Sequence, residues 1–231
     1  MIVFNFSDGG RTEISAITLF SQLMVSIPET IGSFSTLTYL YVSNNRLTCL
    51  PDSIGCLTSL TALYVDNNQL AHFTDSIGSL ISLITLSAKN NLLTKLPASF
   101  GNLMSLRELF TDNNQLTFLP DSIGSLMSLF RLSVINNQLV RIPESIGNLT
   151  TLTSLYISNN RLTYLPDSIG NLSSLKWLNV NNNQLACLPE SIAQLTSLSH
   201  FYVSSNIITS SPAGKSDVKR RFERAGLIVF C

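Results

Sequence analysis

The sequence predicts an α/β repeat protein in which 23-residue units stack into one elongated solenoid. Three observations support this prediction. A leucine recurs every 23 residues from Leu37 to Leu198 without insertion or deletion, an asparagine holds one fixed place in each unit, and the apolar positions between them keep a constant phase. A fixed period of about 20 to 50 residues is typical of stacked repeats. We therefore base the fold prediction on the period and not on separate helix or strand assignments.

Each full unit follows the pattern LxxLxVxxNxLxxLPxSIGxLxS. Positions 1, 4, 6, 11, 14, 18 and 21 are apolar and are expected to point inward together. Pro at position 15 and Gly at position 19 are expected to shape the return path of the chain. One unit buries too few side chains to offset the backbone entropy of its own residues, so the units are expected to be stable only as a stack with protected ends.

The ninth position is the most regular polar position of the unit. An amide side chain offers two donor hydrogens and one acceptor oxygen, so after a short strand it can bond backbone groups of its own loop and of the next coil. We therefore expect a ladder of structural asparagines along the solenoid, formed by Asn45, Asn68, Asn91, Asn114, Asn137, Asn160, Asn183 and Asn206.

The two ends depart from the repeat and predict three regions. Residues 1–36 are expected to form an N-terminal cap, in which a hairpin from "MIVFNFSDGGRTEIS" precedes a degenerate unit with Gln22 in place of the asparagine. Residues 37–212 hold the 23-residue repeats, and residues 213–231 are expected to form a C-terminal cap with a helix in "SDVKRRFERAG" and an edge strand in "LIVFC". The degenerate unit keeps the buried phase at Ile14, Ile17, Leu19, Met24, Ile27 and Phe34.

These motifs resemble the leucine-rich repeat family, whose signature LxxLxLxxNxL is matched in each full unit. The continuation "LPDSIGNLSSL" is similar to the subclass found in cytosolic Ras-pathway scaffolds, plant intracellular Ras-group-related repeat proteins, and bacterial and protist relatives. The resemblance covers residues 14 to 212. It implies a curved right-handed coil with a parallel β-sheet on the concave side and loops or short 3-10 or helical turns on the convex side. The family fold serves many partners, so the resemblance specifies the fold more sharply than the role.

Composition argues against several function classes. Of 231 residues, 45% are hydrophobic and 12% are charged, and 14 basic residues balance 14 acidic ones, so no global field attracts nucleic acid or an anionic membrane. No apolar run reaches the roughly 18 residues that cross a bilayer, and the N-terminus lacks a secretory signal, so we expect a cytoplasmic protein without a membrane span. The four cysteines form no CxxC pair and are interpreted as reduced thiols.

No set of residues predicts catalysis, so we expect a noncatalytic chain without cofactor or metal. His72 and His200 lack Cys or carboxylate partners at ligand spacing. "SPAGKS" lacks the first glycine of a phosphate loop, because Thr209 stands there. The carboxylates at position 16 occur once per repeat, which indicates a solvated row at the start of each convex turn rather than a calcium site: Asp52, Asp75, Asp121, Glu144, Asp167 and Glu190.

The variable positions of the strands carry the functional prediction. Side chains alternate along a strand, so positions 4 and 6 face the core while positions 3 and 5 face outward, flanked by positions 2, 7 and 8. Aromatic side chains there bury a large area at small entropic cost, and charges fix the orientation of a partner. We predict a protein-binding surface on the concave face formed by Tyr39, Tyr41, Tyr64, Lys89, Arg107, Glu108, Phe110, Asp112, Arg131, Tyr156, Trp177, His200 and Tyr202.

The predicted function is an adaptor or scaffold that binds another protein, with two alternatives left open. One is a microbial effector or surface-displayed protein, delivered to a host or secreted, that binds a host protein. The other is a structural or self-associating repeat protein, because the apolar "MIVF" and "LIVFC" of a chain expected to be monomeric could pair at sheet edges. A simpler interpretation of the concave face is also open: tyrosine favours strands, and Arg131 can pair with Glu108 across them.

Overall fold

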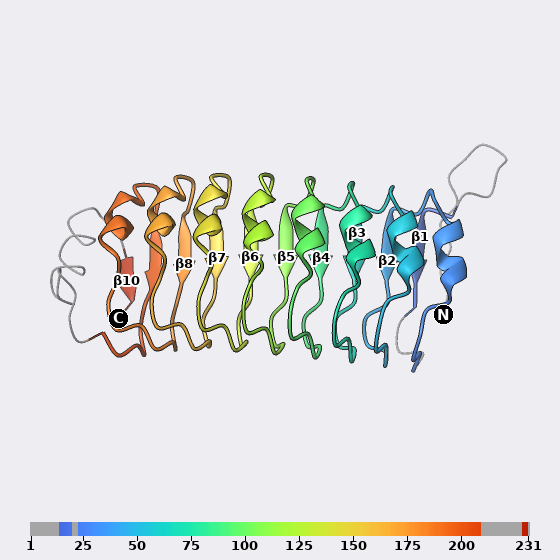
Figure 1. Ribbon diagram of the computed structural model, residues 1–231, viewed down its shortest axis with the longest axis horizontal. Coiled ribbons are helices and arrows are strands. Elements are labelled where there is room, and N and C mark those ends of the chain that lie inside the picture. Colours follow the sequence, from blue (N-terminus) through green and yellow to red (C-terminus); the bar gives the residue numbers. More distant parts are fainter. Residues whose placement is uncertain (1–13, 20–22, 209–227, 231) are drawn as a thin grey trace.

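The computed structural model describes residues 14–19, 23–208 and 228–230. It confirms the predicted solenoid: short parallel strands form one side and 3-10 helices form the other (Figure 1). The strands are β1 Ala16–Thr18, β2 Tyr39–Tyr41, β3 Ala62–Tyr64, β4 Thr85–Ser87, β5 Glu108–Phe110, β6 Arg131–Ser133, β7 Ser154–Tyr156, β8 Trp177–Asn179, β9 His200–Tyr202 and β10 Ile228–Phe230. The 3-10 helices are η1 Glu29–Ser33, η2 Asp52–Cys56, η3 Asp75–Ser79, η4 Ala98–Asn102, η5 Asp121–Ser125, η6 Glu144–Asn148, η7 Asp167–Asn171 and η8 Glu190–Gln194.

The sheet runs in chain order from β1 to β10, and each neighbouring pair of strands is parallel. From β1 to β9 the register equals the sequence period, so Leu86 lies opposite Leu109 and Leu109 opposite Leu132. Identical positions of successive units therefore form straight columns. β10 closes the described sheet, with Val229 opposite Phe201. The predicted hairpin of residues 1–15 lies outside the described residues except for Ile14 and Ser15, and the predicted helix near the C-terminus lies outside them entirely.

The core is a continuous column of apolar side chains between the sheet and the 3-10 helices. The strand leucines at position 4, such as Leu109, are fully buried, as the repeat pattern predicts. The degenerate first unit keeps this phase, because Ile17 and Ile27 are buried. Four further residues of that unit are partly buried and pack against the core: Ile14, Leu19, Met24 and Phe34.

The asparagines at position 9 bond two adjacent coils. The Nδ2 of Asn114 donates to the carbonyl oxygens of Thr111 in its own loop (3.1 Å) and of Ala88 in the preceding coil (2.9 Å). Its Oδ1 accepts from the backbone N–H of Leu93, also in the preceding coil, at 2.9 Å. The ladder thus reaches back to the preceding unit, whereas the sequence suggested the next one. The direction follows from the strand register, which places the loop of the earlier unit within reach of each amide.

A second column of asparagines occupies position 8 and was missed by the sequence analysis. Each of these residues has a positive φ, for example 57° at Asn113 and 55° at Asn90. Asparagine tolerates this left-handed conformation better than most residues, so the turn geometry accounts for its recurrence. The Asn-Asn dipeptide that follows each strand from β2 to β8 was the available signal.

Seven of the eight described 3-10 helices begin at a carboxylate of position 16, and η4 begins at Ala98; each follows an extended residue, usually proline. At η1, η2 and η6 the residue before the helix is a proline, which provides no side-chain cap. Instead, Glu29 Oε2 accepts from the backbone N–H of Ser53 in the next unit at 3.0 Å, and Glu144 Oε2 accepts from Ser168 N–H at 3.3 Å. Hydrogen bonds from Ser53 lower the pKa of Glu29. The carboxylate row therefore also links neighbouring helices.

Candidate protein-binding surface

The solvent-facing side chains at positions 3 and 5 of β2 to β9 form a surface that we call the sheet face. Its outer thirds carry aromatic rings that are partly exposed, whereas Ser87, Ser133 and Ser154 are buried and shallow. The sheet face therefore has two aromatic ends and a middle in which small serines flank Phe110 and charged side chains. Of the thirteen residues predicted for binding, twelve lie on this face or on its border at position 7, and Arg107 lies apart.

Three tyrosines form one aromatic end. The ring centroids of Tyr41 and Tyr64 are 4.6 Å apart with nearly parallel planes, and Tyr39 stacks on Tyr41 at 6.3 Å. Tyr39 is the most exposed of the three, at 45%. Burial, followed by the neighbouring Tyr41 and acidic groups, raises the pKa of the Tyr64 hydroxyl. Stacking fixes these rings, so they present a preformed apolar platform with hydroxyl groups at its rim.

Trp177 and His200 form the other aromatic end. Their rings stack across β8 and β9 with centroids 3.6 Å apart and planes 6° apart. The Nδ1 of His200 also lies 2.9 Å from the hydroxyl oxygen of Ser199. Tyr156 on β7 and Tyr202 on β9 flank Asn179 in the adjacent position 5 column. This end offers a rigid ring pair and, in the adjacent column, two further phenol groups.

Charged residues occupy the middle of the sheet face in two pairs. Lys89 Nζ lies 3.7 Å from Asp112 Oδ2 and 4.5 Å from the centroid of the Phe110 ring. Arg131 Nη1 lies 3.4 Å from Glu108 Oε1 on the adjoining strand, so the cross-strand pairing left open by the sequence is present. Lys89, Glu108 and Arg131 are partly exposed, so this part of the face presents charges of both signs to a partner. They contribute orientation more than stability.

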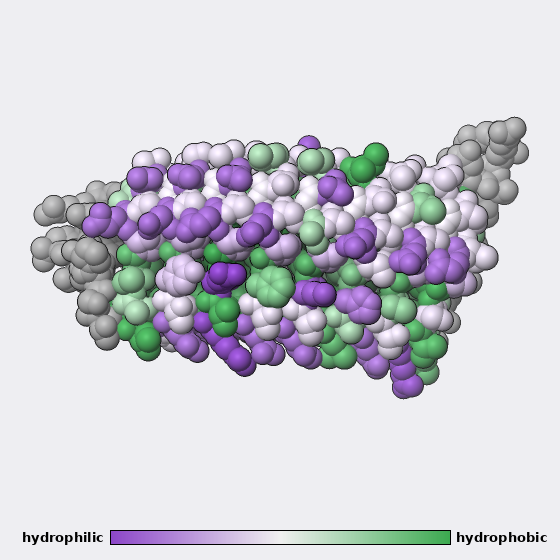
Figure 2. Space-filling model, in the orientation of Figure 1, coloured by the Kyte–Doolittle hydropathy of each residue, from purple (hydrophilic) through white to green (hydrophobic). Residues whose placement is uncertain are grey.

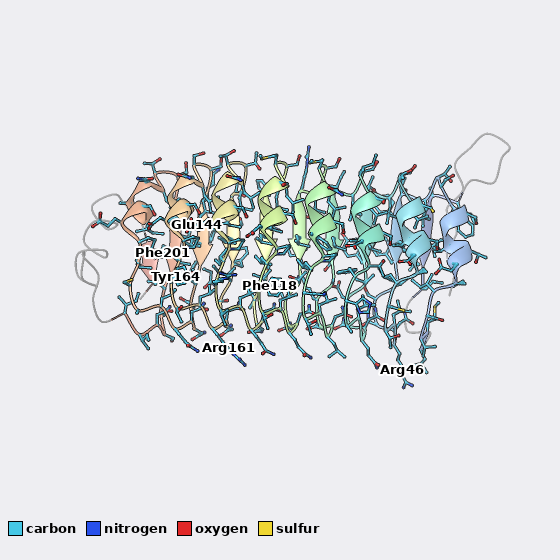
Figure 3. The ribbon with its side chains drawn as sticks, viewed as in Figure 1. Arg46, Phe118, Glu144, Arg161, Tyr164 and Phe201 are labelled. Atoms are coloured by element: carbon cyan, nitrogen blue, oxygen red, sulfur yellow. The ribbon has the colours of Figure 1, made fainter. Side chains whose placement is uncertain are left out.

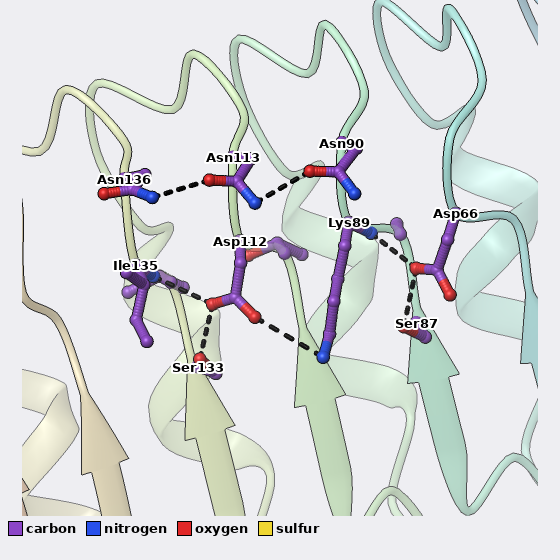
Figure 4. A network of polar contacts seen from close by, with 12 residues as sticks. Asp66, Ser87, Lys89, Asn90, Asp112, Asn113, Ser133, Ile135 and Asn136 are labelled. Atoms are coloured by element: carbon purple, nitrogen blue, oxygen red, sulfur yellow. Dashed lines mark hydrogen bonds and ion pairs between the residues drawn. The ribbon is translucent and has the colours of Figure 1, made fainter.

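Asp112 is held by the protein itself (Figure 4). Its carboxylate accepts hydrogen bonds from the Ser133 hydroxyl and from the Ile135 backbone N–H (2.9 Å), and only 9% of the residue is exposed. Asp66 is the equivalent residue two units earlier and makes the same contacts. Its carboxylate accepts from the Ser87 hydroxyl at 2.6 Å and from the Lys89 backbone N–H at 2.7 Å. Sequence reasoning missed this motif, although its signal was present: Asp at position 7 precedes Ser at position 5 of the next unit.

A row of exposed amides borders the charged middle (Figure 4). Asn90 donates to Asn67 at 2.7 Å, Asn113 donates to Asn90 at 2.7 Å, and Asn136 donates to Asn113 at 2.6 Å. Each amide keeps a second donor for a ligand. This row adds a line of hydrogen-bonding groups to the rim of the sheet face.

The opposite face also has a hollow, of about 600 Å³, next to η5 and η6. Its lining includes Phe118, Arg141 and Tyr164, which occupy position 13 of three successive units. Figure 3 places Phe118, Glu144 and Tyr164 on the side of the 3-10 helices, and Figure 2 shows this side. The hollow mixes aromatic rings with charges of both signs.

Neither a metal site nor a membrane-spanning helix is found in the part of the chain that the structure describes. No group of three or more His, Cys, Asp or Glu side chains there could hold a metal ion. None of the described helices combines the length and apolar character that crossing a bilayer requires. Cys49, Cys56 and Cys187 are exposed free thiols.

Comparison with known protein families identifies the repeat. A family model described as "Leucine-rich repeat region" matches residues 144–218, and one described as "Leucine rich repeat" matches residues 18–70. The chain belongs to the leucine-rich repeat proteins. No curated protein matches the sequence.

Solved leucine-rich repeat structures resemble this chain over most of its length. A leucine-rich repeat protein of Leptospira interrogans is 33% identical with a TM-score of 0.77, covering 80% of this chain and 47% of that one. The plant peptide hormone receptor RGFR1, solved in complex with RGF2, is 32% identical with a TM-score of 0.73, covering 78% and 30%. The ectodomain of the Arabidopsis thaliana receptor kinase GASSHO1/SCHENGEN3, in complex with CASPARIAN STRIP INTEGRITY FACTOR 2, is 31% identical with a TM-score of 0.69, covering 84% and 27%. The chain thus spans less than half the length of each of these proteins.

Proposed function

We propose that this leucine-rich repeat protein is a noncatalytic adaptor or scaffold in the cytoplasm that binds another protein on its sheet face. The leucine-rich repeat fold implies protein–protein interaction, and two of the similar structures are receptors solved with bound partners. The adaptor role and the location go beyond these likenesses. The observation that carries the proposal is the sheet face itself, where two stacked aromatic clusters flank paired charges on a rigid sheet.

The energetic argument favours a protein partner. Stacked rings lose little freedom when they are covered, so each exposed aromatic group can act as an anchor at the centre of an interface. The charged pairs and the row of amides between the anchors would then select the register of the partner. The small side chains of Ser87 and Ser133, on either side of Phe110, leave room for a protruding segment of that partner.

A second candidate is a microbial protein that recognises a host protein. The likeness to a Leptospira interrogans leucine-rich repeat protein favours it. This candidate uses the same sheet face and differs only in where the partner resides. Identification of the bound partner therefore separates the two, since an adaptor binds a protein of its own cell and a recognition protein binds one of a host.

The test compares three forms of the chain as bait for affinity purification with quantitative mass spectrometry. The first is wild type, the second carries Tyr156→Ala, Trp177→Ala and Tyr202→Ala, and the third carries Phe118→Ala and Tyr164→Ala on the opposite face as a matched control. Circular dichroism verifies the fold of each. We expect a partner that the control retains and the sheet-face variant loses at least tenfold; retention of every partner by both variants would refute the proposal.

A further inference from the structure

Five large apolar side chains gather on the edge of the solenoid where the 3-10 helices turn into the strands. Position 22, in the turn, holds Ile81, Met104 and Met127, with exposures of 58%, 57% and 57%. Position 2, directly before the strand, holds Ile84 and Phe130, with exposures of 40% and 45%. We call these five residues the turn-edge patch. The upper edge of Figure 2 shows green apolar groups over the middle of the solenoid.

The apolar residues of the turn-edge patch differ from the residues that other units place at the same positions. The other full units place only polar residues at these two positions, among them Thr58, Thr150, Thr38 and Thr153. The fold therefore does not require apolar residues there, because the same turn forms with threonine. Isolated exposed apolar residues are common on monomers, but neighbouring ones in three successive helix-to-strand turns form a continuous surface.

Backbone contacts show that the position 2 residues of three successive units lie side by side. Arg107 N–H donates to the carbonyl oxygen of Ile84 at 2.8 Å, and Phe130 N–H donates to the carbonyl oxygen of Arg107 at 2.8 Å. Arg107 thus lies between the two position 2 residues, in the same helix-to-strand turn as Met104, which precedes it by three residues. It is exposed, and the ion pairs of the described residues, Lys89–Asp112 and Arg131–Glu108, do not include it. One exposed guanidinium therefore stands at the centre of an apolar patch.

From this arrangement we infer that the turn-edge patch binds an amphipathic α-helix of a partner protein that carries a carboxylate within its apolar stripe. Successive units are spaced by about 4.8 Å along the sheet, and successive turns of an α-helix by about 5.4 Å. A helix lying along the solenoid axis would therefore place one apolar turn over each of the three helix-to-strand turns. Its carboxylate would pair with Arg107 in a bidentate geometry. Methionine side chains adapt well to such a surface.

The size and charge of the patch favour a helix over a second copy of the chain. Five side chains that are about half exposed present on the order of 500 Å², whereas a stable interface buries about 800 Å² on each partner. A two-fold contact centred on the patch would also bring Arg107 toward its own copy, and like charges in an apolar contact repel. A single helix needs less area and can supply the opposite charge.

The test uses the full chain to select from a displayed library of helices of about 20 residues, with apolar residues fixed at i, i+3, i+4 and i+7. Selected helices are expected to carry Asp or Glu beside the apolar stripe. The variant Ile81→Thr/Met104→Thr/Met127→Thr, which installs the residue of other repeats, should weaken their binding at least tenfold. Leu92→Thr/Val140→Thr, which replaces exposed apolar residues elsewhere, should leave binding unchanged. Arg107→Glu should abolish binding, and a charge-reversed helix should restore it.

Several results would overturn the inference. The first is that no helix is selected, or that the selected helices bind the triple-threonine variant equally well. The second is a wild-type dimer in light scattering that becomes monomeric in that variant, which would assign the patch to a second copy. The third is sedimentation with phosphatidylcholine vesicles that the variant loses, which would assign it to a membrane. The sheet-face variant with Tyr156→Ala, Trp177→Ala and Tyr202→Ala should keep helix binding, so failure here is distinct from failure of the proposed function.

Discussion

The imidazole of His200 covers one face of the Trp177 indole across two neighbouring strands, with ring centroids 3.6 Å apart. Trp177 is the only tryptophan of the chain, so its fluorescence reports directly on this end of the sheet face. The contact joins residues 23 positions apart and depends on the parallel register. It therefore reports on repeat stacking as well as on partner binding.

Removal of this ring contact gives the first prediction. In His200→Ala, one face of the indole becomes exposed to water, so the emission maximum of Trp177 should shift to longer wavelength. The lost aromatic contact should lower the free energy of unfolding by about 0.5–1.5 kcal/mol, measured by urea denaturation. His72→Ala, which removes an exposed histidine from another part of the repeat, should leave the emission unchanged. An unshifted spectrum in His200→Ala would contradict the stacked geometry.

The second prediction concerns the close approach of successive 3-10 helices. A Cβ placed on Gly101 would lie 2.7 Å from the Cβ of Ser122 in the next unit. Gly101→Ala should therefore lower the free energy of unfolding by about 1–3 kcal/mol through overpacking. In the double variant with Ser122→Gly, part of this loss should return, because the opposing Cβ is removed. Ala193 stands at the same repeat position in η8 and is exposed, so Ala193→Ser serves as the control with little effect.

The third prediction tests the asparagine ladder. Asn114→Ala removes the acceptor of Leu93 N–H and a donor to the Ala88 and Thr111 carbonyl oxygens. Because these groups are buried, the free energy of unfolding should fall by about 2–4 kcal/mol. Gln115→Ala, at the adjacent exposed position, is the control and should change it by less than about 0.5 kcal/mol. Equal thermal and urea stability of the two variants would show that the ladder contributes nothing.

The fourth prediction separates backbone conformation from side-chain bonding at position 8. Asn113 has φ 57°, and its amide also takes part in the exposed row. Asn113→Ala should destabilise the fold by about 1 kcal/mol because alanine resists the left-handed conformation. Asn113→Gly should retain most of the stability, since glycine adopts this conformation freely. If glycine proved as damaging as alanine in urea denaturation, the amide contacts would be the main reason for asparagine here.

The fifth prediction concerns alkaline pH. Burial and the neighbouring Tyr41 raise the pKa of Tyr64 above its ordinary value of 10.0, so the folded state favours the neutral phenol. This contribution to stability is complete below the unfolded pKa and is lost as the pH rises through the folded pKa. Phenolate absorbance should therefore show one late-titrating tyrosine that Tyr64→Phe removes. Tyr164→Phe, which changes an exposed ring, should leave the late step in place.

Much of the fold followed from the period alone. A gapless 23-residue repeat with a fixed apolar phase permits only a stack in which like positions align, and the register of Leu86, Leu109 and Leu132 shows that alignment. The buried phase of the degenerate first unit was also visible, because Ile17 and Ile27 continue the apolar pattern. The sequence did not show whether the asparagines bond the preceding or the next unit, because that depends on which neighbouring loop lies within reach.

The candidate surface could be predicted only in outline. Alternation along a strand indicated which side chains face outward, and Trp177 and Tyr64 do so. The same reasoning could not show that Asp112 is bonded to Ser133 and Ile135, because those contacts depend on distances between units. The alternation rule also placed Arg107 on the border of the sheet face, because position 2 directly precedes the strand. The structure instead places Arg107 among apolar neighbours outside that face.

By itself, the sequence determined the leucine-rich repeat solenoid, because a periodic pattern of buried leucines and fixed asparagines is satisfied by one way of stacking. The tertiary structure decided how the variable side chains combine: the Tyr41–Tyr64 and Trp177–His200 stacks, the bonded Asp112 and the turn-edge patch. The physical reason is one of scale. The pattern of buried positions is the same in every unit, so the sequence of one unit is enough to predict it. Recognition instead depends on contacts between side chains of different units, which the parallel register brings together.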